Sequence, residues 1–164
     1  VLMILNVAQC IMADLHVRPI LIKSMASNHA NTGISLNEKS PFSVSEKQVP
    51  AALTMMVDSM TSMVERAKKY CSDVEFSPMD ATRTNSEYLF EMMEAVIRAG
   101  ATTINIADTV GYAIPSDFGN LLRRLQENVT GIENVTLSVH CHNDLGLAVG
   151  NSLAALLNAA RQVE

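Results

Sequence analysis

The second half of the sequence alternates between short apolar segments and amphipathic segments, and this alternation limits the fold more than any other feature. Segments rich in β-branched and apolar residues are expected to form strands at residues 73–77, 102–107 and 135–142. Strand–helix units of about thirty residues that repeat along a chain form right-handed βαβ crossovers and build a parallel sheet. The pattern therefore predicts an α/β fold.

The segments between these strands carry apolar residues at helical spacing. Thr84 and Glu87 form a capping-box pattern at the start of the first helix, and Gly100 is expected to end it. A second helix is expected from Pro115, and a third over residues 147–160. The third helix is expected to direct three leucines inward: Leu153, Leu156 and Leu157.

The sheet is expected to belong to a (β/α) TIM-barrel type. No glycine-rich phosphate-binding fingerprint follows any expected strand, so a dinucleotide-binding fold has no support. A closed barrel takes about 250 residues, whereas this chain has 164 and residues 161–164 resemble the start of a further strand. We therefore expect an incomplete barrel over residues 51–164, which opens with a helix at 51–70. Residues 1–50 are expected to be partly loop or disordered, with one strand at 18–23.

Composition and charge exclude several classes of protein. The chain is 48% hydrophobic and 18% charged, which is too apolar for a disordered protein. Its net charge of −5 offers no basic surface for nucleic acid or for an anionic membrane. No apolar run reaches the roughly 20 residues of a membrane-spanning helix. Three cysteines without a CxxC motif fit a reduced, intracellular protein, and the first residue, Val1, suggests that the true start lies upstream.

His140 and His142 are the clearest candidates for chemistry. Residues i and i+2 of a strand project to the same side, so two imidazoles at a strand end can share one divalent metal. Metal sites usually have three or more protein ligands, so surface or hydrogen-bonded histidines are the competing interpretation of this spacing. Cys141 should face the other side as a small apolar residue.

Other polar residues follow the first two strands. Asp80 and Arg83 either bind a substrate carboxylate or pair with each other. Thr109 either holds a substrate oxygen or caps its own loop.

Three segments resemble motifs of one enzyme family. They are DVEFSPMDATR at residues 73–83, GATTINIADTVGY at 100–112 and SVHCHNDLGLAVGNSLAA at 138–155. They are similar to segments of 2-isopropylmalate synthase and its relatives, whose HMG-CoA-lyase-like, pyruvate carboxyltransferase-type barrels include citramalate, homocitrate and methylthioalkylmalate synthases. The resemblance is dense from about residue 67 to residue 164.

The resemblance implies a metal-dependent Claisen condensation of acetyl-CoA with 2-oxoisovalerate, a step of leucine biosynthesis. His140 and His142 would bind the metal ion (Mg²⁺, Mn²⁺ or Zn²⁺), which polarises the 2-oxo carbonyl as a Lewis acid. The resemblance assigns the remaining roles to two pairs of residues: oxo-acid binding to Ser77 and Thr109, and support of the metal ligands to Asn143 and Asp144.

The sequence also departs from the family pattern. Met79 stands where the family has a glutamate near the oxo acid, and Ala107 replaces a proline. The family's Arg-Asp strand, its Asn-Gly-x-Gly-Glu-Arg segment and its regulatory domain have no counterpart in these 164 residues. A metal ion is therefore expected to bind weakly, if at all, and the chain alone is expected to be inactive.

Two interpretations of function stay open. The chain is either the middle of an acyltransferase barrel or an inert fragment that acts, if at all, as an interaction module. The first takes acetyl-CoA and a 2-oxo acid as substrates. The second pairs with a full-length relative or with further copies of itself. The choice of oxo acid stays open, because small differences in pocket volume separate these relatives. The expected location is the cytoplasm, or the plastid in a plant.

Overall fold

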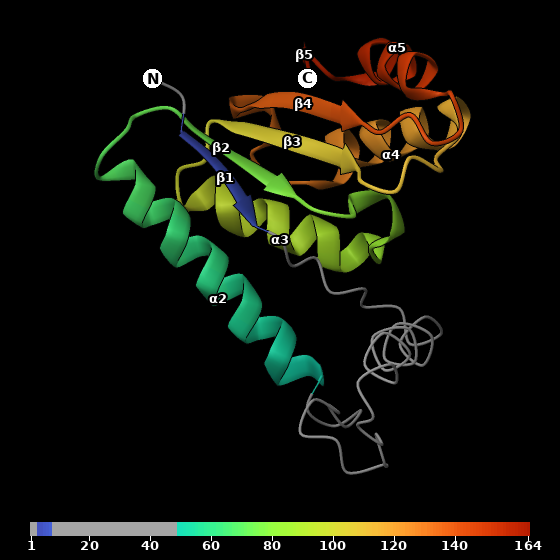
Figure 1. Cartoon of the computed structure of the whole chain (residues 1–164). Coiled ribbons are helices and arrows are strands. Elements are labelled where there is room, and N and C mark those ends of the chain that lie inside the picture. The colour runs from blue at the N-terminus through green and yellow to red at the C-terminus, as the bar shows by residue number, and fades with distance from the viewer. Residues whose placement is uncertain (1–2, 8–48) are drawn as a thin grey trace, which may run out of the picture.

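The computed structural model of the chain describes residues 3–7 and 49–164 (Figure 1). Five strands form one sheet in the order β1-β2-β3-β4-β5, and every neighbouring pair is parallel. The strands are Met3–Val7 (β1), Val74–Pro78 (β2), Thr103–Asp108 (β3), Thr136–Cys141 (β4) and Gln162–Val163 (β5). The predicted parallel α/β fold is confirmed, and the described strands are fewer than the eight of a closed barrel.

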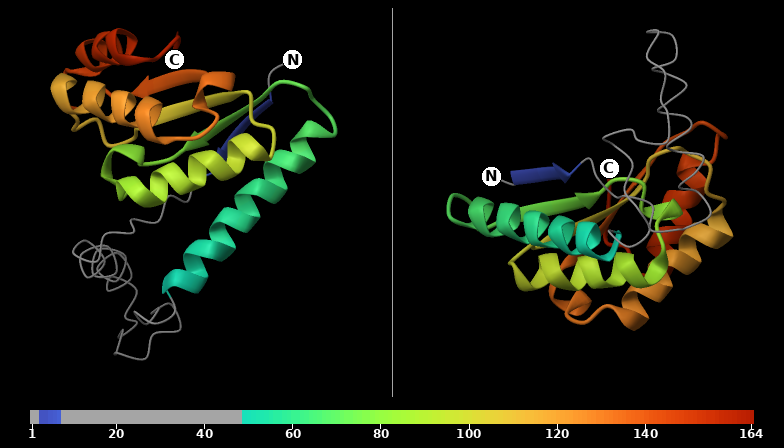
Figure 2. Two further views of the ribbon diagram at one scale, coloured as in Figure 1. Left: turned by 180° about the vertical axis from the view of Figure 1, so that it is seen from behind. Right: turned by 90° about the horizontal axis from the view of Figure 1, so that it is seen from below.

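Within residues 49–164, four α-helices accompany the sheet. They are Val49–Lys68 (α2), Ser86–Arg98 (α3), Pro115–Asn128 (α4) and Ala148–Asn158 (α5). Two short 3₁₀ helices, Ala81–Arg83 (η2) and Ile132–Asn134 (η3), lie in the connections. Figures 1 and 2 show α2, α3 and α4 along one face of the sheet, with α5 beside α4 near the β4–β5 end.

The strand register sorts side chains into an apolar and a polar face. Phe76, Ile104 and Leu137 are register partners and pack into the core with residues of the helices. Alternate positions project to the opposite face. That second face carries polar side chains that are nonetheless buried: Glu75, Ser77, Thr103, Asn105 and Ser138. A buried polar face across neighbouring strands is where a ligand site is expected.

The start of α3 differs from the predicted capping box. Asn85 is the N-cap, and its Oδ1 accepts a hydrogen bond from the Tyr88 backbone N–H at 3.1 Å. The Thr84 hydroxyl instead donates to the Asp80 carbonyl at 3.0 Å. The prediction is wrong because Thr84 closes the η2 turn that precedes the helix, a turn that the sequence pattern did not reveal.

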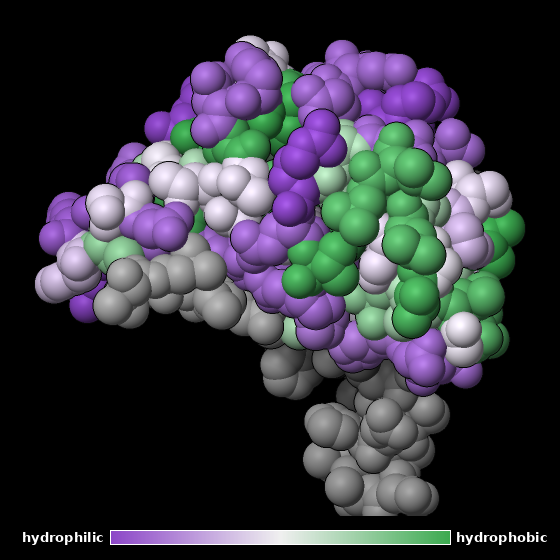
Figure 3. Space-filling view, turned by 90° about the horizontal axis from the view of Figure 1, so that it is seen from above, coloured by the Kyte–Doolittle hydropathy of each residue, from purple (hydrophilic) through white to green (hydrophobic). Residues whose placement is uncertain are grey.

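The predicted orientation of the α5 leucines is also wrong. Leu153, Leu156 and Leu157 are 57%, 41% and 88% exposed, and Figure 3 shows apolar side chains gathered over this helix. The fully buried residues of α5 are instead Asn151 and Ala155. Helix α5 packs on α4 through small groups, since a Cβ at Gly119 would lie 3.3 Å from the Ala154 carbonyl oxygen. This close approach turns the leucine side of α5 away from the described core.

Some predictions fall in the first fifty residues. The expected strand at 18–23 and most of the expected loop lie outside the described residues. Val49 and Pro50 belong to α2 rather than to a loop, and β1 pairs with β2 in the same sheet as the rest of the chain. In the part of the chain that the structure describes, no helix combines the length and apolar character needed to cross a bilayer.

Candidate metal and substrate site

The candidate residues gather at the carboxyl ends of three adjacent strands. Ser77 lies near the end of β2, Thr109 directly follows β3, and His140 lies near the end of β4. The register pairs Ala107 with His140 across β3 and β4. In parallel α/β folds, ligands bind at this edge of the sheet.

His140 and His142 face the same side, as their spacing predicts. Their ring centroids are 5.2 Å apart and the ring planes meet at 64°. The His142 backbone N–H donates to the Asp108 carbonyl at 3.2 Å, which fixes the end of β4 against β3. The two imidazoles are therefore close enough to contribute to a single site.

Cys141, between the two histidines, has a different environment. It is partly buried and packs against the core, as the sequence predicts for a small apolar residue. Burial raises the pKa of its thiol, which favours the protonated form over a metal-binding thiolate.

The described residues supply no third ligand beside the two imidazoles. Among residues 3–7 and 49–164, no three His, Cys, Asp or Glu side chains are grouped so that they could hold a metal ion. Catalytic zinc sites use three protein ligands and structural sites use four. The two histidines alone therefore fit a weak site.

Ser77 and Thr109 are both anchored to neighbouring backbone. The Ser77 hydroxyl, 6% exposed, donates to the Asn105 carbonyl at 3.3 Å. Thr109 Oγ1 accepts a hydrogen bond from the Asp80 backbone N–H at 2.8 Å. Ser77 thus keeps acceptor capacity, whereas Thr109 keeps its hydroxyl proton.

Asp80 and Arg83 pair with each other. Arg83 Nε lies 2.7 Å from Asp80 Oδ1, and Arg83 Nη2 lies 2.6 Å from Asp80 Oδ2. Asp80 adopts the left-handed backbone conformation, with φ 63° and ψ 33°. This conformation costs an ordinary residue about 1–2 kcal/mol, although aspartate tolerates it better than most.

Asn143 and Asp144 support the loop that follows β4. Asn143 Oδ1 accepts from the Ala148 N–H at 3.2 Å, at the first turn of α5. Asp144 lies against Gly111 so closely that a Cβ there would be 2.5 Å from Asp144 Oδ2. Gly111 also has φ +61°, so a side chain at this position meets both a clash and backbone strain.

Sequence reasoning missed a carboxyl pair on the polar face of the sheet. The Asn105 amide donates to Glu75 Oε1 at 3.3 Å and to Glu164 Oε2 at 3.0 Å. The Gln162 amide donates to Glu75 Oε2 at 3.3 Å and to Glu164 Oε1 at 2.8 Å. Burial, together with the Glu164 carboxyl, raises the pKa of Glu75 to about 7. The sequence does contain one indication of this pair: Glu75 stands between the apolar residues Val74 and Phe76 of an expected strand.

Two buried oxygens beside this pair have no hydrogen-bond partner within the described part of the chain. They are Asn105 Oδ1 and Ser138 Oγ, on register-paired residues of β3 and β4. Buried polar atoms are nearly always satisfied by protein, water or ligand. The polar face therefore retains capacity to bind polar groups.

Asp108 is a second residue that sequence reasoning missed. Its buried carboxylate accepts from Thr82 Oγ1 at 3.2 Å, from the Ala113 N–H at 3.2 Å and from Asn151 Nδ2 at 3.5 Å. These bonds join the end of β3 to η2 and to α5. The Asp108 backbone carbonyl also accepts from the His142 N–H, so this residue connects the end of β3 to the segment that carries His142.

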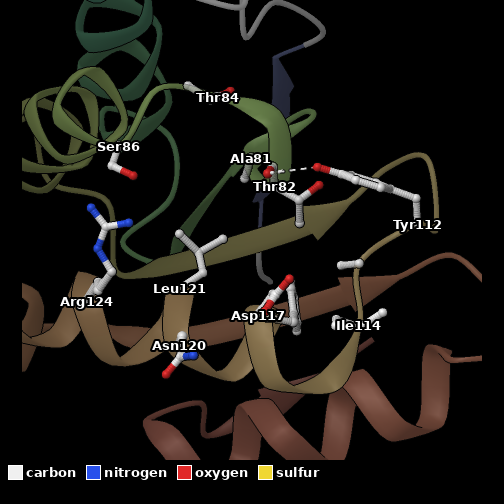
Figure 4. Close-up of a pocket in the computed structure, with 12 residues that line it drawn as sticks. Ala81, Thr82, Thr84, Ser86, Tyr112, Ile114, Asp117, Asn120, Leu121 and Arg124 are labelled. Carbon is white, nitrogen blue, oxygen red and sulfur yellow. Dashed lines mark hydrogen bonds between the residues drawn. The ribbon is translucent and has the colours of Figure 1, made fainter. Parts of the chain in front are cut away.

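A separate cavity of about 420 Å³ lies between η2, α3 and α4. Figure 4 shows the Tyr112 hydroxyl directed toward the Thr82 carbonyl, at 3.5 Å, on one side of this space. Arg124 and Ser86 also line this cavity. None of the predicted site residues lines the cavity.

Comparison with known proteins identifies close relatives for most of the chain. The HMGL-like family model matches residues 24–164. The 2-isopropylmalate synthase of Syntrophus aciditrophicus is 59% identical over 117 residues, which cover 71% of this chain and 23% of that protein. The 2-isopropylmalate synthase of Gloeobacter violaceus is 47% identical over 161 residues, which cover 98% of this chain and 29% of that protein.

A solved structure shares the fold. The crystal structure of HMG-CoA lyase from Brucella melitensis matches 67% of this chain and 40% of its own chain, with a TM-score of 0.55 and 15% identity. At this identity the match shows a common fold alone. The present chain spans less than a third of the length of either synthase.

Proposed function

Because the chain belongs to the HMGL-like family, we propose that it is part of a 2-isopropylmalate synthase, an acyltransferase that condenses acetyl-CoA with 2-oxoisovalerate. The observation that carries this proposal is the placement of His140 and His142. Their imidazoles lie edge to face, 5.2 Å apart, at the carboxyl edge of the sheet, and a backbone hydrogen bond ties His142 to the residue that precedes Thr109.

His140 and His142 are the proposed ligands of a divalent metal ion. When bound, such an ion supplies Lewis-acid polarisation of the 2-oxo carbonyl. Thr109 would donate its hydroxyl proton to an oxygen of the oxo acid, and Ser77 would line the same pocket. Asn143 and Asp144 would hold the loop so that the imidazoles keep their orientation.

A second candidate function is an inert fragment that acts as an interaction module. Met79 favours it, because a thioether can neither take up nor release a proton where the family pattern has a glutamate. The two-histidine donor set of the described residues also favours it. The exposed leucines of α5 offer a surface for a full-length relative or for a second copy of the chain.

The remaining parts of the proposal rest on the sequence. An intracellular location is supported by the cysteine pattern, since the sequence has no CxxC motif and Cys141 is a free thiol. The choice of 2-oxoisovalerate over other 2-oxo acids rests on the relatives that are named 2-isopropylmalate synthase.

CoA release from acetyl-CoA tests whether this chain catalyses the condensation by itself. The purified chain, with 2-oxoisovalerate and Mg²⁺, Mn²⁺ or Zn²⁺, is expected to release no detectable CoA. Met79→Glu alone should not restore turnover, because the metal ion would still lack its further ligands. Metal-dependent turnover that disappears in the double variant His140→Ala/His142→Ala would establish the enzyme and exclude the inert fragment.

A further inference from the structure

Asp80 has an unusual backbone conformation directly after β2. Its φ of 63° makes it the one residue other than glycine, among those that the structure describes, in the left-handed region of backbone conformation. Such conformations persist only where the surroundings hold them, and they concentrate at functional sites. The hydrogen bonds that hold Asp80 in this conformation therefore indicate its role.

The side-chain carboxylate and the backbone carbonyl of Asp80 both accept hydrogen bonds from residues that follow it in the sequence. Arg83 binds the carboxylate through two parallel hydrogen bonds of 2.7 and 2.6 Å, a geometry that fixes direction as well as distance. The Asp80 carbonyl accepts from the Arg83 N–H at 3.1 Å and from the Thr84 hydroxyl at 3.0 Å. The peptide group before residue 80 is consequently directed toward β3.

The Asp80 N–H meets the hydroxyl of Thr109 on that side. The distance from Asp80 N to Thr109 Oγ1 is 2.8 Å, and this bond joins the loops after β2 and β3. A threonine hydroxyl has one proton to donate and accepts through lone pairs. With a lone pair engaged by Asp80, the proton must point elsewhere. Within the described residues the Thr109 hydroxyl donates to no protein acceptor.

We propose that Arg83 and Asp80 are positioning residues that aim the Thr109 hydroxyl proton at an oxygen of the 2-oxo acid. This inference rests on the proposed function, in which Thr109 holds the oxo acid. In this proposal Arg83 acts through Asp80 and not on the substrate: two of its donors bind the Asp80 carboxylate, and its effect passes through the Asp80 N–H to Thr109.

The first test concerns the hydrogen-bond chain itself and needs no substrate. Amide hydrogen exchange of residue 80 is measured by NMR in the full chain. Thr109→Val and Arg83→Lys should each speed this exchange about five- to tenfold, because each removes one of the side-chain groups in the hydrogen-bond series from Arg83 through Asp80 to Thr109. Thr109→Ser keeps the hydroxyl and should leave the rate unchanged. Arg123→Lys, which alters an exposed ion pair on α4, is the matched control.

Two outcomes of this first test would overturn the proposal. One is an unchanged exchange rate at residue 80 in Thr109→Val. The other is an acceleration in Arg83→Lys that the core amide of Ile104 shares equally, since that would mean general destabilisation. Arg83→Gln provides a second variant of the same link if the lysine variant does not fold.

The second test measures whether the hydrogen bonds from Arg83 through Asp80 to Thr109 contribute to binding of the 2-oxo acid. Binding of 2-oxoisovalerate in the presence of MgCl₂ is measured for Arg83→Lys, Thr109→Val and the double variant. Each single change should weaken binding about three- to tenfold, and the double change should weaken it no more than Thr109→Val alone. Additive losses would overturn the proposal, because Arg83 would then act independently of Thr109. If the unaltered chain binds no oxo acid, the proposed function fails in this chain, whereas the exchange measurement still decides whether Arg83 and Asp80 position Thr109.

Discussion

Glu75 and Glu164 accept hydrogen bonds from the same two amide groups, those of Asn105 and Gln162. All four carboxyl oxygens are engaged in this arrangement, on the polar face of the sheet. Two carboxyl groups so close together favour retention of one proton, and burial reinforces this effect. The cluster joins β2, β3 and the end of the chain below the candidate metal site.

The carboxyl pair makes folding stability depend on pH. The pKa of Glu75 rises from 4.5 to about 7 on folding, so the folded state binds more protons between these values. Stability should therefore fall as the pH rises from about 5 to about 7, by up to about 3 kcal/mol, and should level off above that. Urea unfolding across this range measures the effect. Glu75→Gln should remove most of the slope, whereas Glu91→Gln, an exposed control, should keep it. An equal slope in Glu75→Gln would contradict the assignment.

The buried carboxylate of Asp108 should be sensitive to a change of a single atom. The Ala113 N–H and the Asn151 amide both donate to Oδ2, so the amide oxygen of Asp108→Asn must take that position, and the Thr82 hydroxyl must reverse to accept from the new amide nitrogen. Both bonds to Oδ2 also lose their negatively charged acceptor. We expect a loss of about 1–3 kcal/mol in the free energy of unfolding. Asp117→Asn, at an exposed position of α4, should change it by less than about 0.5 kcal/mol. Equal stability of Asp108→Asn and the unaltered chain would show that these hydrogen bonds do not form.

The exposed leucine side of α5 should cause the chain to associate. Leu153 and Leu157 belong to an apolar surface on this helix, and such surfaces mark sites of interaction or aggregation. Sedimentation velocity should show species larger than a monomer that grow with concentration. The double variant Leu153→Lys/Leu157→Lys should reduce them, whereas Leu145→Lys, exposed in the loop before α5, should not. A monodisperse monomer at every concentration would contradict this expectation.

Local patterns in the sequence located the strands β2, β3 and β4 and drew attention to the histidine pair, because both depend on alternation within one segment. They did not reveal β1, which is recognised by its pairing with β2. The leucines of α5 were wrongly predicted to be buried. Helical spacing shows which residues share one side of a helix, but it does not show whether another element packs against that side. The capping box failed because Thr84 belongs to a 3₁₀ turn, which has no clear sequence pattern. The Glu75–Glu164 pair and the Asp80–Thr109 bond depend on strand register and on one left-handed residue, so they became visible only in three dimensions.

We expect a divalent metal ion to bind at His140 and His142, beside Thr109. Mn²⁺ broadens NMR signals of nuclei close to it, so titration of the full chain with MnCl₂ locates the ion directly. We predict that broadening begins at His140 and His142, spreads to the amide of Thr109, and is lost in His140→Ala/His142→Ala. Glu75→Gln should leave the pattern unchanged. Broadening centred on Glu75 and Glu164, or broadening that persists in the double histidine variant, would contradict metal binding by His140 and His142.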